Sequence, residues 1–280
     1  MLQDGTARIV ISGAGQGIGR ALARHFASKG HKIFVLDVNE DNIKHTAEVH
    51  LKEYFETNNV GWAVCDLRSV DSIRQTVRSK AAVFLDNHID FLVNNAGISN
   101  PYWGDGKTME DESVLEQWQA YVETNLTGTF VMSQACLPYM KVDRQEDKQK
   151  LPGSKVGTVG PCIIHISSFR ALISDPNQEG YASTKAALLG LTQSMAVSMQ
   201  SLGIRVNQVS PGRIKATHEH REGEEKGRAE WGMGEDDVKD HPTNRAGVPE
   251  DIAEAVEYLL GAGFVTGQDL VVDGGVGKVK

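Results

Sequence analysis

Short runs of apolar and β-branched residues recur along the chain, and longer segments with apolar positions at helical spacing separate them. The runs predict seven strands, over residues 7–12, 32–37, 60–64, 90–94, 161–167, 204–209 and 269–272. The longer segments predict helices over residues 17–29, 41–56, 70–85, 182–202 and 249–260, and a long helix that ends near Met140. Because the strands are apolar along most of their length, both faces of the sheet should be covered by helices. The pattern therefore predicts a doubly wound α/β domain around a seven-stranded, mainly parallel sheet.

Two polar segments interrupt this alternation. Residues 141–160 form a long connector ahead of an apolar strand, and we expect a surface insertion there. Residues 216–241 follow the sixth predicted strand, at the end where ligands bind in an open α/β sheet. We expect a substrate lid over residues 216–241, with a solvated surface loop as the alternative. No linker separates two hydrophobic cores, so residues 1–280 are expected to form one domain.

The composition narrows the class of protein. Hydrophobic residues make up 40% of the chain, as in ordinary globular domains. Cys65, Cys136 and Cys162 have neither paired nor metal-ligand spacing, so we expect buried thiols and no metal site. No apolar run reaches the roughly 18–20 residues of a membrane span, and Asp4 and Arg8 lie where a signal peptide would be apolar. The net charge of −8 argues against nucleic acid as a partner, and we expect a cytoplasmic protein.

The turn after the first predicted strand is rich in glycine. Gly13, Gly17 and Gly19 flank Gln16 and Ile18 where the first helix begins. Glycines let the backbone turn tightly and approach a pyrophosphate, which then lies at the positive end of the helix dipole. A tight turn that binds no ligand is the alternative.

Asp37 ends the second predicted strand, about 20 residues beyond the glycines, where a carboxylate can accept hydrogen bonds from an adenosine ribose. The carboxylate would repel a ribose 2′-phosphate, and neither Gln16 nor Val38 supplies a cation for it. The sequence therefore favours NAD over NADP. A solvated carboxylate or a helix cap is the alternative for Asp37.

Tyr181 and Lys185 lie four residues apart at the start of a predicted helix, which places them on one helical face. A neighbouring ammonium favours the phenolate and lowers the pKa of a tyrosine, and such a pair can move a proton to or from an alcohol oxygen. Taken alone, the pair matches many unrelated helices. Its weight comes from the other motifs in the chain.

These motifs follow one another from the first predicted strand to the last. They comprise Gly13, Gly17 and Gly19, Asp37, Asp66-Leu67, Asn94-Asn95-Ala96-Gly97, Asn125, Ser167-Ser168, Tyr181 and Lys185, Pro211-Gly212, the run from Arg245 to Asp251, and Asp273-Gly274-Gly275. In this order they resemble the short-chain dehydrogenase/reductase family. The resemblance covers essentially the whole chain and implies a single Rossmann domain.

The resemblance also implies roles for single residues. Tyr181 would be the general acid/base, Lys185 would bind the nicotinamide ribose and lower the pKa of Tyr181, Ser168 would orient the reacting oxygen, and Asn125 would hold a water in a proton relay. We prefer Ser168 to Ser167 because it lies thirteen residues before Tyr181, the usual family interval. The implied cofactor-binding residues are Gly13, Gln16, Gly17, Ile18, Gly19, Asp37, Asp66, Leu67, Asn94, Ala96, Gly97, Tyr181, Lys185, Pro211, Gly212 and Ile214.

Several of these residues have plain structural alternatives. Asn125 is also suited to a polar kink, Ser168 to a helix cap and Asn94 to holding loop amides. His165 stands between Ile164 and Ile166, so we expect a buried structural histidine there.

The expected substrate pocket mixes polar, charged and aromatic residues. Its candidates are 99–103, Phe169 and Arg170, 178–180 and the lid segment. This mixture suits a polyhydroxylated small molecule, so we predict an NAD-dependent oxidoreductase that interconverts a secondary alcohol and a ketone on a sugar alcohol or sugar. A 3-oxoacyl thioester or hydroxysteroid reductase is the second reading, and a non-catalytic NAD-binding regulator the third. Family resemblance and apolar helix positions predict a homo-oligomer, with a tetramer as the expected state.

Overall fold

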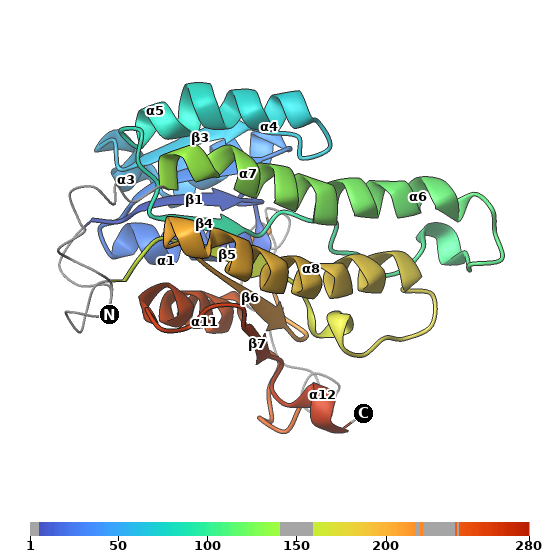
Figure 1. Cartoon of the computed structure of the whole chain (residues 1–280). Coiled ribbons are helices and arrows are strands. Elements are labelled where there is room, and N and C mark those ends of the chain that lie inside the picture. The colour runs from blue at the N-terminus through green and yellow to red at the C-terminus, as the bar shows by residue number, and fades with distance from the viewer. Residues whose placement is uncertain (1–5, 141–158, 217–218, 221–238, 240, 280) are drawn as a thin grey trace.

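A seven-stranded sheet runs through the computed structural model, which describes residues 6–140, 159–216, 219–220, 239 and 241–279 (Figure 1). Its strand order is β3-β2-β1-β4-β5-β6-β7, and every neighbouring pair is parallel. The strands are β1 Arg8–Ser12, β2 Lys32–Asp37, β3 Val60–Val64, β4 Phe91–Asn94, β5 Cys162–Ile166, β6 Arg205–Pro211 and β7 Asp269–Val272. The predicted doubly wound α/β class is therefore confirmed, and the sheet is parallel throughout.

Helices cover both faces of the sheet, as the apolar strands predict. On one face α1 and α11 pack through Leu22, Phe26, Ile252 and Val256, and they join Ile9 and Ile11 of β1 in one core. On the other face α4, α7 and α8 close a second core around β4 and β5 (Figure 1). The helices are α1 Gly17–Ser28, α2 Glu40–His45, α3 Lys52–Glu56, α4 Val70–Thr76, α5 Ala82–Phe84, α6 Val114–Tyr121, α7 Thr129–Met140, α8 Glu179–Ser198, α11 Pro249–Gly261 and α12 Val276–Val279.

Several of the predicted helices are not continuous α-helices. The helix predicted over residues 70–85 contains a π-helical stretch, Val77–Ala81, between α4 and α5. The helix predicted over residues 41–56 is broken at Leu51, whose buried side chain packs into the α1 core, and its backbone leaves the helical region at φ −115° and ψ 21°. The long helix that ends at Met140 contains a π-helical stretch, Val122–Gly128, between α6 and α7. Such stretches occur often at functional sites, and this one carries Asn125.

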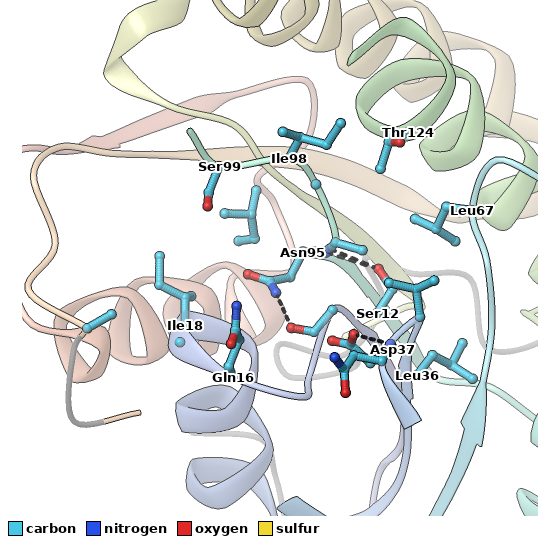
Figure 2. Close-up of a pocket in the computed structure, with 18 of the residues that line it drawn as sticks. Ser12, Gln16, Ile18, Leu36, Asp37, Leu67, Asn95, Ile98, Ser99 and Thr124 are labelled. Atoms are coloured by element: carbon cyan, nitrogen blue, oxygen red, sulfur yellow. Dashed lines mark hydrogen bonds between the residues drawn. The ribbon is translucent and has the colours of Figure 1, made fainter. Parts of the chain in front are cut away.

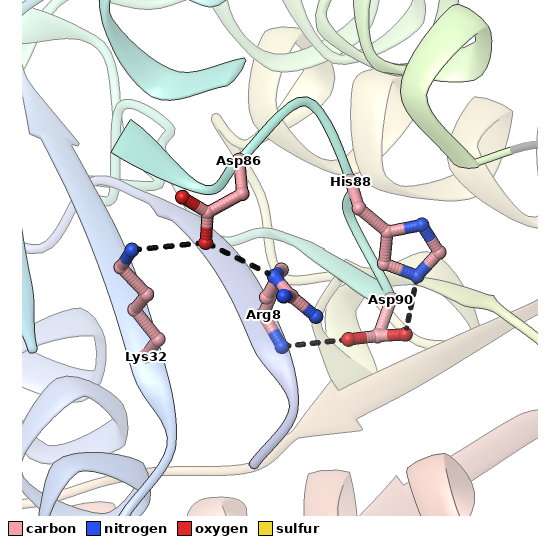
Figure 3. Close-up of polar contacts among 5 residues, drawn as sticks. All are labelled: Arg8, Lys32, Asp86, His88 and Asp90. Carbon is pink, nitrogen blue, oxygen red and sulfur yellow. Dashed lines mark hydrogen bonds and ion pairs between the residues drawn. The ribbon is translucent and has the colours of Figure 1, made fainter. Parts of the chain in front are cut away.

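The amino ends of the strands are closed by polar side chains that contact one another (Figure 3). The Asp90 carboxylate accepts a hydrogen bond from the backbone N–H of Arg8 at 2.7 Å and lies 2.8 Å from His88 Nε2. Asp86 pairs with Lys32 at 3.1 Å and with Arg8 at 3.6 Å. At this edge, opposite charges along the strand ends are matched within the chain.

The sequence also predicts features that the structure tests only in part. Cys65, Cys136 and Cys162 are buried free thiols, as expected, and burial raises the pKa of Cys136 to about 12. His165 is fully buried, and its Nδ1 lies 2.9 Å from the Thr192 hydroxyl. Among the described helices, none is long and apolar enough to cross a bilayer.

Both polar segments fall largely outside the described residues. The predicted insertion, 141–160, is described only at residues 159 and 160, and the predicted lid, 216–241, only at 216, 219–220, 239 and 241. Both assignments stay predictions.

Candidate active site

A cleft of about 780 Å³ lies at the carboxyl ends of the strands (Figure 2). Its walls come from the β1–α1 turn and from the residues that follow β2, β3, β4, β5 and β6. Ligands of open α/β sheets bind at this edge, next to the point where the strand order reverses on either side of β1.

The glycines of the β1–α1 turn are required by geometry. Gly13 and Gly17 have positive φ angles of 68° and 59°, which glycine adopts without strain. A Cβ on Gly13 would lie 2.5 Å from the Cα of Ala96, and one on Gly19 would lie 2.0 Å from the Gly13 carbonyl oxygen. The turn therefore holds α1 close to β4, with the first-turn N–H groups of α1 at the cleft wall.

Asp37 fixes the turn as well as lining the cleft (Figure 2). Its carboxylate accepts hydrogen bonds from the backbone N–H groups of Gly15, at 2.9 Å, and Asn39, at 3.0 Å. The cap of α2 is Asn39, whose side chain accepts from the N–H of Asn42, so the alternative of a helix cap at Asp37 is excluded. Each carboxylate oxygen keeps a lone pair for a further donor.

Ser12 and Asn95 are site residues that the sequence reasoning did not assign. The Ser12 hydroxyl accepts from the N–H groups of Asn95 and Ala96 at 3.2 Å, and Asn95 Nδ2 donates to the Gly13 carbonyl at 2.8 Å (Figure 2). These bonds tie the end of β4 to the glycine turn. Asn95 follows the last residue of β4, and alternation along a strand predicts that it faces away from Asn94.

Three residues predicted for catalysis or cofactor binding lie off the cleft wall, as do the expected pocket residues 100–103, Phe169, Arg170 and 178–180. Asn94 is buried and donates to Ser133 Oγ of α7 at 2.9 Å, so it supports the sheet, and Asn95 takes its place at the cleft. Gly19 lets α1 pack closely against Gly13, because it has no Cβ to clash with the Gly13 carbonyl oxygen. Asn125 turns toward the β4 loop, where its Oδ1 accepts from the N–H of Ile98 at 2.8 Å. The other predicted residues, Gly13, Gln16, Gly17, Ile18, Asp37, Asp66, Leu67, Ala96, Gly97, Ser168, Tyr181, Lys185, Pro211, Gly212 and Ile214, line the cleft.

Tyr181 lies in the first turn of α8 beside Ser168. Burial raises the pKa of the phenol, while a hydrogen bond with Ser168 and the charge of Arg170 lower it. The Ser167 hydroxyl, in contrast, donates to the Lys185 carbonyl at 3.0 Å and so anchors α8 to β5. The preference for Ser168 over Ser167 as the partner of Tyr181 agrees with this geometry.

Lys185 reaches the cleft from the next turn of α8. Its Nζ donates to the Ile166 carbonyl at 2.9 Å and lies 5.6 Å from the centroid of the Tyr181 ring. Burial lowers the pKa of Lys185 to about 8. Burial is the largest cause of the net upward pKa shift of Tyr181, and the role of Lys185 in lowering that pKa stays a prediction.

An aromatic cluster of buried side chains packs against Tyr181. The Tyr121 ring lies edge-on to Tyr181 with centroids 6.3 Å apart, and Trp103 packs against Tyr121. Trp103 Nε1 donates to the Glu179 carboxylate at 2.9 Å, and the Tyr121 hydroxyl donates to the Asn100 carbonyl at 2.6 Å. These bonds hold the rings that flank Tyr181.

The site fits an extended dinucleotide. Asp37 at the end of β2 and Ser168 after β5 are separated by the glycine turn of β1 and by β4, a span of three strand spacings or roughly 14 Å. The N-terminus of α1 lies between them, where a pyrophosphate would meet unpaired N–H groups. Asp37 would hold the adenosine ribose, and Tyr181 and Lys185 would lie at the nicotinamide end.

Comparison with known proteins agrees with this geometry. A family model described as enoyl-(acyl carrier protein) reductase matches residues 13–277. The chain belongs to the short-chain dehydrogenase/reductase family, an oxidoreductase family that uses nicotinamide cofactors.

Relatives with different substrates are similarly close. An oxidoreductase of Thermotoga maritima is 32% identical over 95% of this chain and 94% of that protein, and a 3-oxoacyl-(acyl-carrier-protein) reductase of Buchnera aphidicola is 30% identical over 95% of each. Among solved structures, 7α-hydroxysteroid dehydrogenase complexed with NADH has a TM-score of 0.74 at 28% identity, covering 96% of this chain and 93% of that one. A glucose/ribitol dehydrogenase of Brucella melitensis has a TM-score of 0.74 at 26% identity and 96% coverage of each chain.

Proposed function

We propose that the protein interconverts a secondary alcohol and a ketone with NAD(H), on a sugar alcohol, a sugar or a related polyhydroxylated molecule. The observation that carries the proposal is the placement of Ser168, Tyr181 and Lys185 at one end of a cleft whose other end holds Asp37. Polar cleft residues such as Ser99 and Thr124 support a hydroxyl-rich substrate.

In the proposed mechanism, a bound nicotinamide cofactor supplies or accepts the hydride. The Tyr181 hydroxyl gives a proton to the substrate oxygen during reduction and takes it back during oxidation. The Ser168 hydroxyl orients that oxygen through its contact with Tyr181. Lys185 supplies a positive charge beside Tyr181 when protonated, and the Ile166 carbonyl holds its ammonium in place.

Asn125 has a positioning role in this proposal. Its Oδ1 accepts from the backbone N–H of Ile98, and its Nδ2 donates to Thr184 Oγ1 at 3.2 Å. The side chain therefore ties the π-helical stretch Val122–Gly128 to α8. A Cβ on Gly97 would lie 3.0 Å from Asn125 Oδ1 and 3.6 Å from Lys185 Nζ. Asn125 and Lys185 thus face one another across Gly97, where a relay water would connect them.

We propose NAD as the cofactor because of the charge around Asp37. Gln16, Val38, Asn39 and Asn42 also line that end of the cleft, and none of them carries a charge to offset a 2′-phosphate. Arg68 lines the cleft too, but its Nε is paired with Glu123 at 3.0 Å.

A reductase of 3-oxoacyl thioesters or hydroxysteroids is the second candidate, favoured by the Buchnera and hydroxysteroid relatives. A non-catalytic regulator would not need the set of Ser168, Tyr181 and Lys185 beside the cleft. We also propose a homo-oligomer, with a tetramer as the expected state, acting in the cytoplasm. Exposed apolar side chains on α6, α7 and α8 support self-association: Leu115, Trp118, Phe130 and Val197.

The proposal is tested by following NADH absorbance while polyols, sugars, hydroxysteroids and 3-hydroxyacyl thioesters are offered with NAD. Turnover with polyols or sugars supports it. Turnover confined to thioesters or steroids supports the second candidate. NADH binding without turnover on any member of the panel supports the regulator.

A further inference from the structure

Arg170 is a buried cation next to the proposed catalytic residues. It follows Ser168 by two residues, its backbone N–H donates to Ser168 Oγ at 3.1 Å, and it is 8% exposed. Its guanidinium lies 4.5 Å from the Phe169 ring centroid, and its Nη2 donates to the Asp175 carboxylate. Its Nη1 is buried and has no hydrogen-bond partner among the described residues.

Gln178 presents a second unsatisfied donor beside it. This side chain is 1% exposed, and its Oε1 accepts from the backbone N–H of Asp175 at 3.3 Å. Its Nε2 is buried and, within the described part of the chain, also without a partner. Arg170 and Gln178 both bond to Asp175, so their two unpaired donors lie around the same residue. Gln178 precedes Tyr181 by three residues, about one helical turn.

A second buried arginine has both of its terminal nitrogens paired, and only its Nε lacks a partner among the described residues. Arg205 donates from Nη1 to the Leu259 carbonyl at 2.7 Å and from Nη2 to the Leu260 carbonyl at 2.8 Å, with further carbonyls nearby. Both of its terminal nitrogens are therefore held by backbone oxygens, and the residue is structural. Arg170 instead leaves its buried terminal Nη1 without a partner among the described residues. Buried polar groups are normally hydrogen-bonded, so two unpaired donors around one residue favour an acceptor that the described residues do not supply.

We propose that Arg170 Nη1 and Gln178 Nε2 bind a carboxylate of the substrate, which makes the substrate a hydroxy acid, or the corresponding keto acid. This inference rests on the proposed function and narrows its substrate class. The carbon that carries the reacting hydroxyl would lie between this carboxylate and Tyr181.

The chemistry of the two donors favours a carboxylate over a sugar hydroxyl. Both open groups are donors, and a carboxylate only accepts, whereas a hydroxyl brings a hydrogen that needs its own acceptor. Charge-assisted bonds from a guanidinium to a carboxylate are among the strongest hydrogen bonds in proteins. The nearby carboxylates are already engaged, Asp175 by Arg170 and Glu179 by Trp103 Nε1.

The test compares 2-, 3- and 4-hydroxy carboxylic acids with their methyl esters as substrates for NAD reduction. For at least one acid we expect kcat/KM to exceed that of its ester by about 10- to 100-fold, the size of a charge-assisted bond. Arg170→Met should remove this preference by lowering kcat/KM for the acid about 10- to 100-fold more than for its ester, because loss of the charge near Tyr181 affects both substrates and loss of the carboxylate bond affects only the acid. Gln178→Glu, which places a negative charge at the same point, should also lower turnover of the acid alone. Arg74→Met, at an exposed arginine of α4, is the matched control.

A binding experiment checks the same point without turnover. The deoxy analogue of the preferred acid should raise the melting temperature of the wild-type NADH complex and leave that of Arg170→Met unchanged. Equal kcat/KM for every acid and its ester, or equal loss for both in Arg170→Met, would overturn the inference and leave Arg170 as the structural partner of Asp175. If Arg170→Met fails to fold, Gln178→Glu decides by the same criterion. Oxidation of neutral polyols without any preference for acids leaves the proposed function standing, whereas no turnover on any alcohol overturns that function itself.

Discussion

The two edges of the sheet carry similar kinds of polar residue and use them differently. At the amino edge, Arg8, Lys32, Asp86, His88 and Asp90 contact one another across the starts of β1, β2 and β4 (Figure 3). At the carboxyl edge, the polar residues surround a cleft of about 780 Å³ (Figure 2). Carboxylates illustrate the difference, because Asp90 and Asp37 each accept a backbone N–H bond but only Asp37 faces the cleft.

The difference follows from how a parallel sheet is built. Each crossover enters a strand at the amino edge through a short turn, where side chains can reach their neighbours. At the carboxyl edge the chain must leave toward a helix on one face or the other, and the departure of adjacent connections to opposite faces opens a crevice. Polar groups at the amino edge therefore stabilise the fold, and those at the carboxyl edge are available to a ligand.

The largest expected effect comes from the proposed proton donor. Tyr181→Phe keeps the ring that packs against Tyr121 but removes the hydroxyl, so turnover should fall by roughly 10²–10⁴-fold while NADH binding is retained. Initial rates and NADH fluorescence titrations measure the two quantities. Tyr258→Phe, at an exposed tyrosine, is the control. Near wild-type turnover in Tyr181→Phe would remove this residue from the mechanism.

Next in size is the choice of cofactor. Wild type should use NAD far better than NADP, because Asp37 repels a 2′-phosphate. Replacing Asp37 by Ser together with Val38→Arg should narrow or invert the ratio of kcat/KM for the two cofactors. Equal use of both cofactors by the wild-type protein would contradict the role given to Asp37.

A smaller effect concerns His165 in the middle of β5. Burial and the charge of Lys185 lower the pKa of His165 from 6.5 to about 4. As the pH falls below 6.5, His165 binds a proton in the unfolded chain but not in the folded one. The free energy of unfolding therefore decreases from pH 6.5 down to about pH 4.

Urea unfolding across this range checks the size of that loss. Between pH 6.5 and 4, the free energy of unfolding of wild type should fall by about 3 kcal/mol more than that of His165→Gln, at 1.36 kcal/mol per pKa unit. Parallel pH curves for wild type and His165→Gln would contradict the prediction.

The smallest effect sharpens the comparison of the two edges. Asp90→Ala removes an acceptor of one backbone N–H bond and Asp37→Ala an acceptor of two, so the variants should lose about 1 and about 2 kcal/mol of stability. Only Asp37→Ala should weaken NADH binding, and Asp90→Ala should leave kcat/KM unchanged. Loss of NADH affinity in Asp90→Ala would indicate that NADH binds at the amino edge, which would contradict the comparison.

Much of this molecule follows from its sequence because strands and glycine turns are local signals. The apolar runs place β2, β3 and β7 at their observed residues and the other strands within one or two. The break at Leu51 was not predicted, since it arises from packing against α1 and not from a glycine or proline.

Site residues that belong to a sequence motif could be predicted. Where only tertiary contacts decide which of two adjacent residues faces the cleft, the prediction was less accurate. Asp37 and Tyr181 lie at the cleft as expected, whereas Asn95 replaces Asn94 there because the end of β4 turns its side chains alternately. The upward pKa shift of Tyr181 depends on burial. The unpaired donors of Arg170 and Gln178 result from which of their other atoms bond to Asp175. Sequence spacing contains neither quantity.

The central claim, that the carboxyl edge binds the dinucleotide and the amino edge does not, is tested most directly by amide hydrogen exchange with and without NADH. The account predicts that NADH slows exchange in the β1–α1 turn around Gly17, at Asn95 and Ala96 after β4, and at Ser167 and Ser168 after β5. Exchange at Lys32 and Asp90, on the amino edge, should not change. Protection at the amino edge, or no protection at the glycine turn at saturating NADH, would contradict the account.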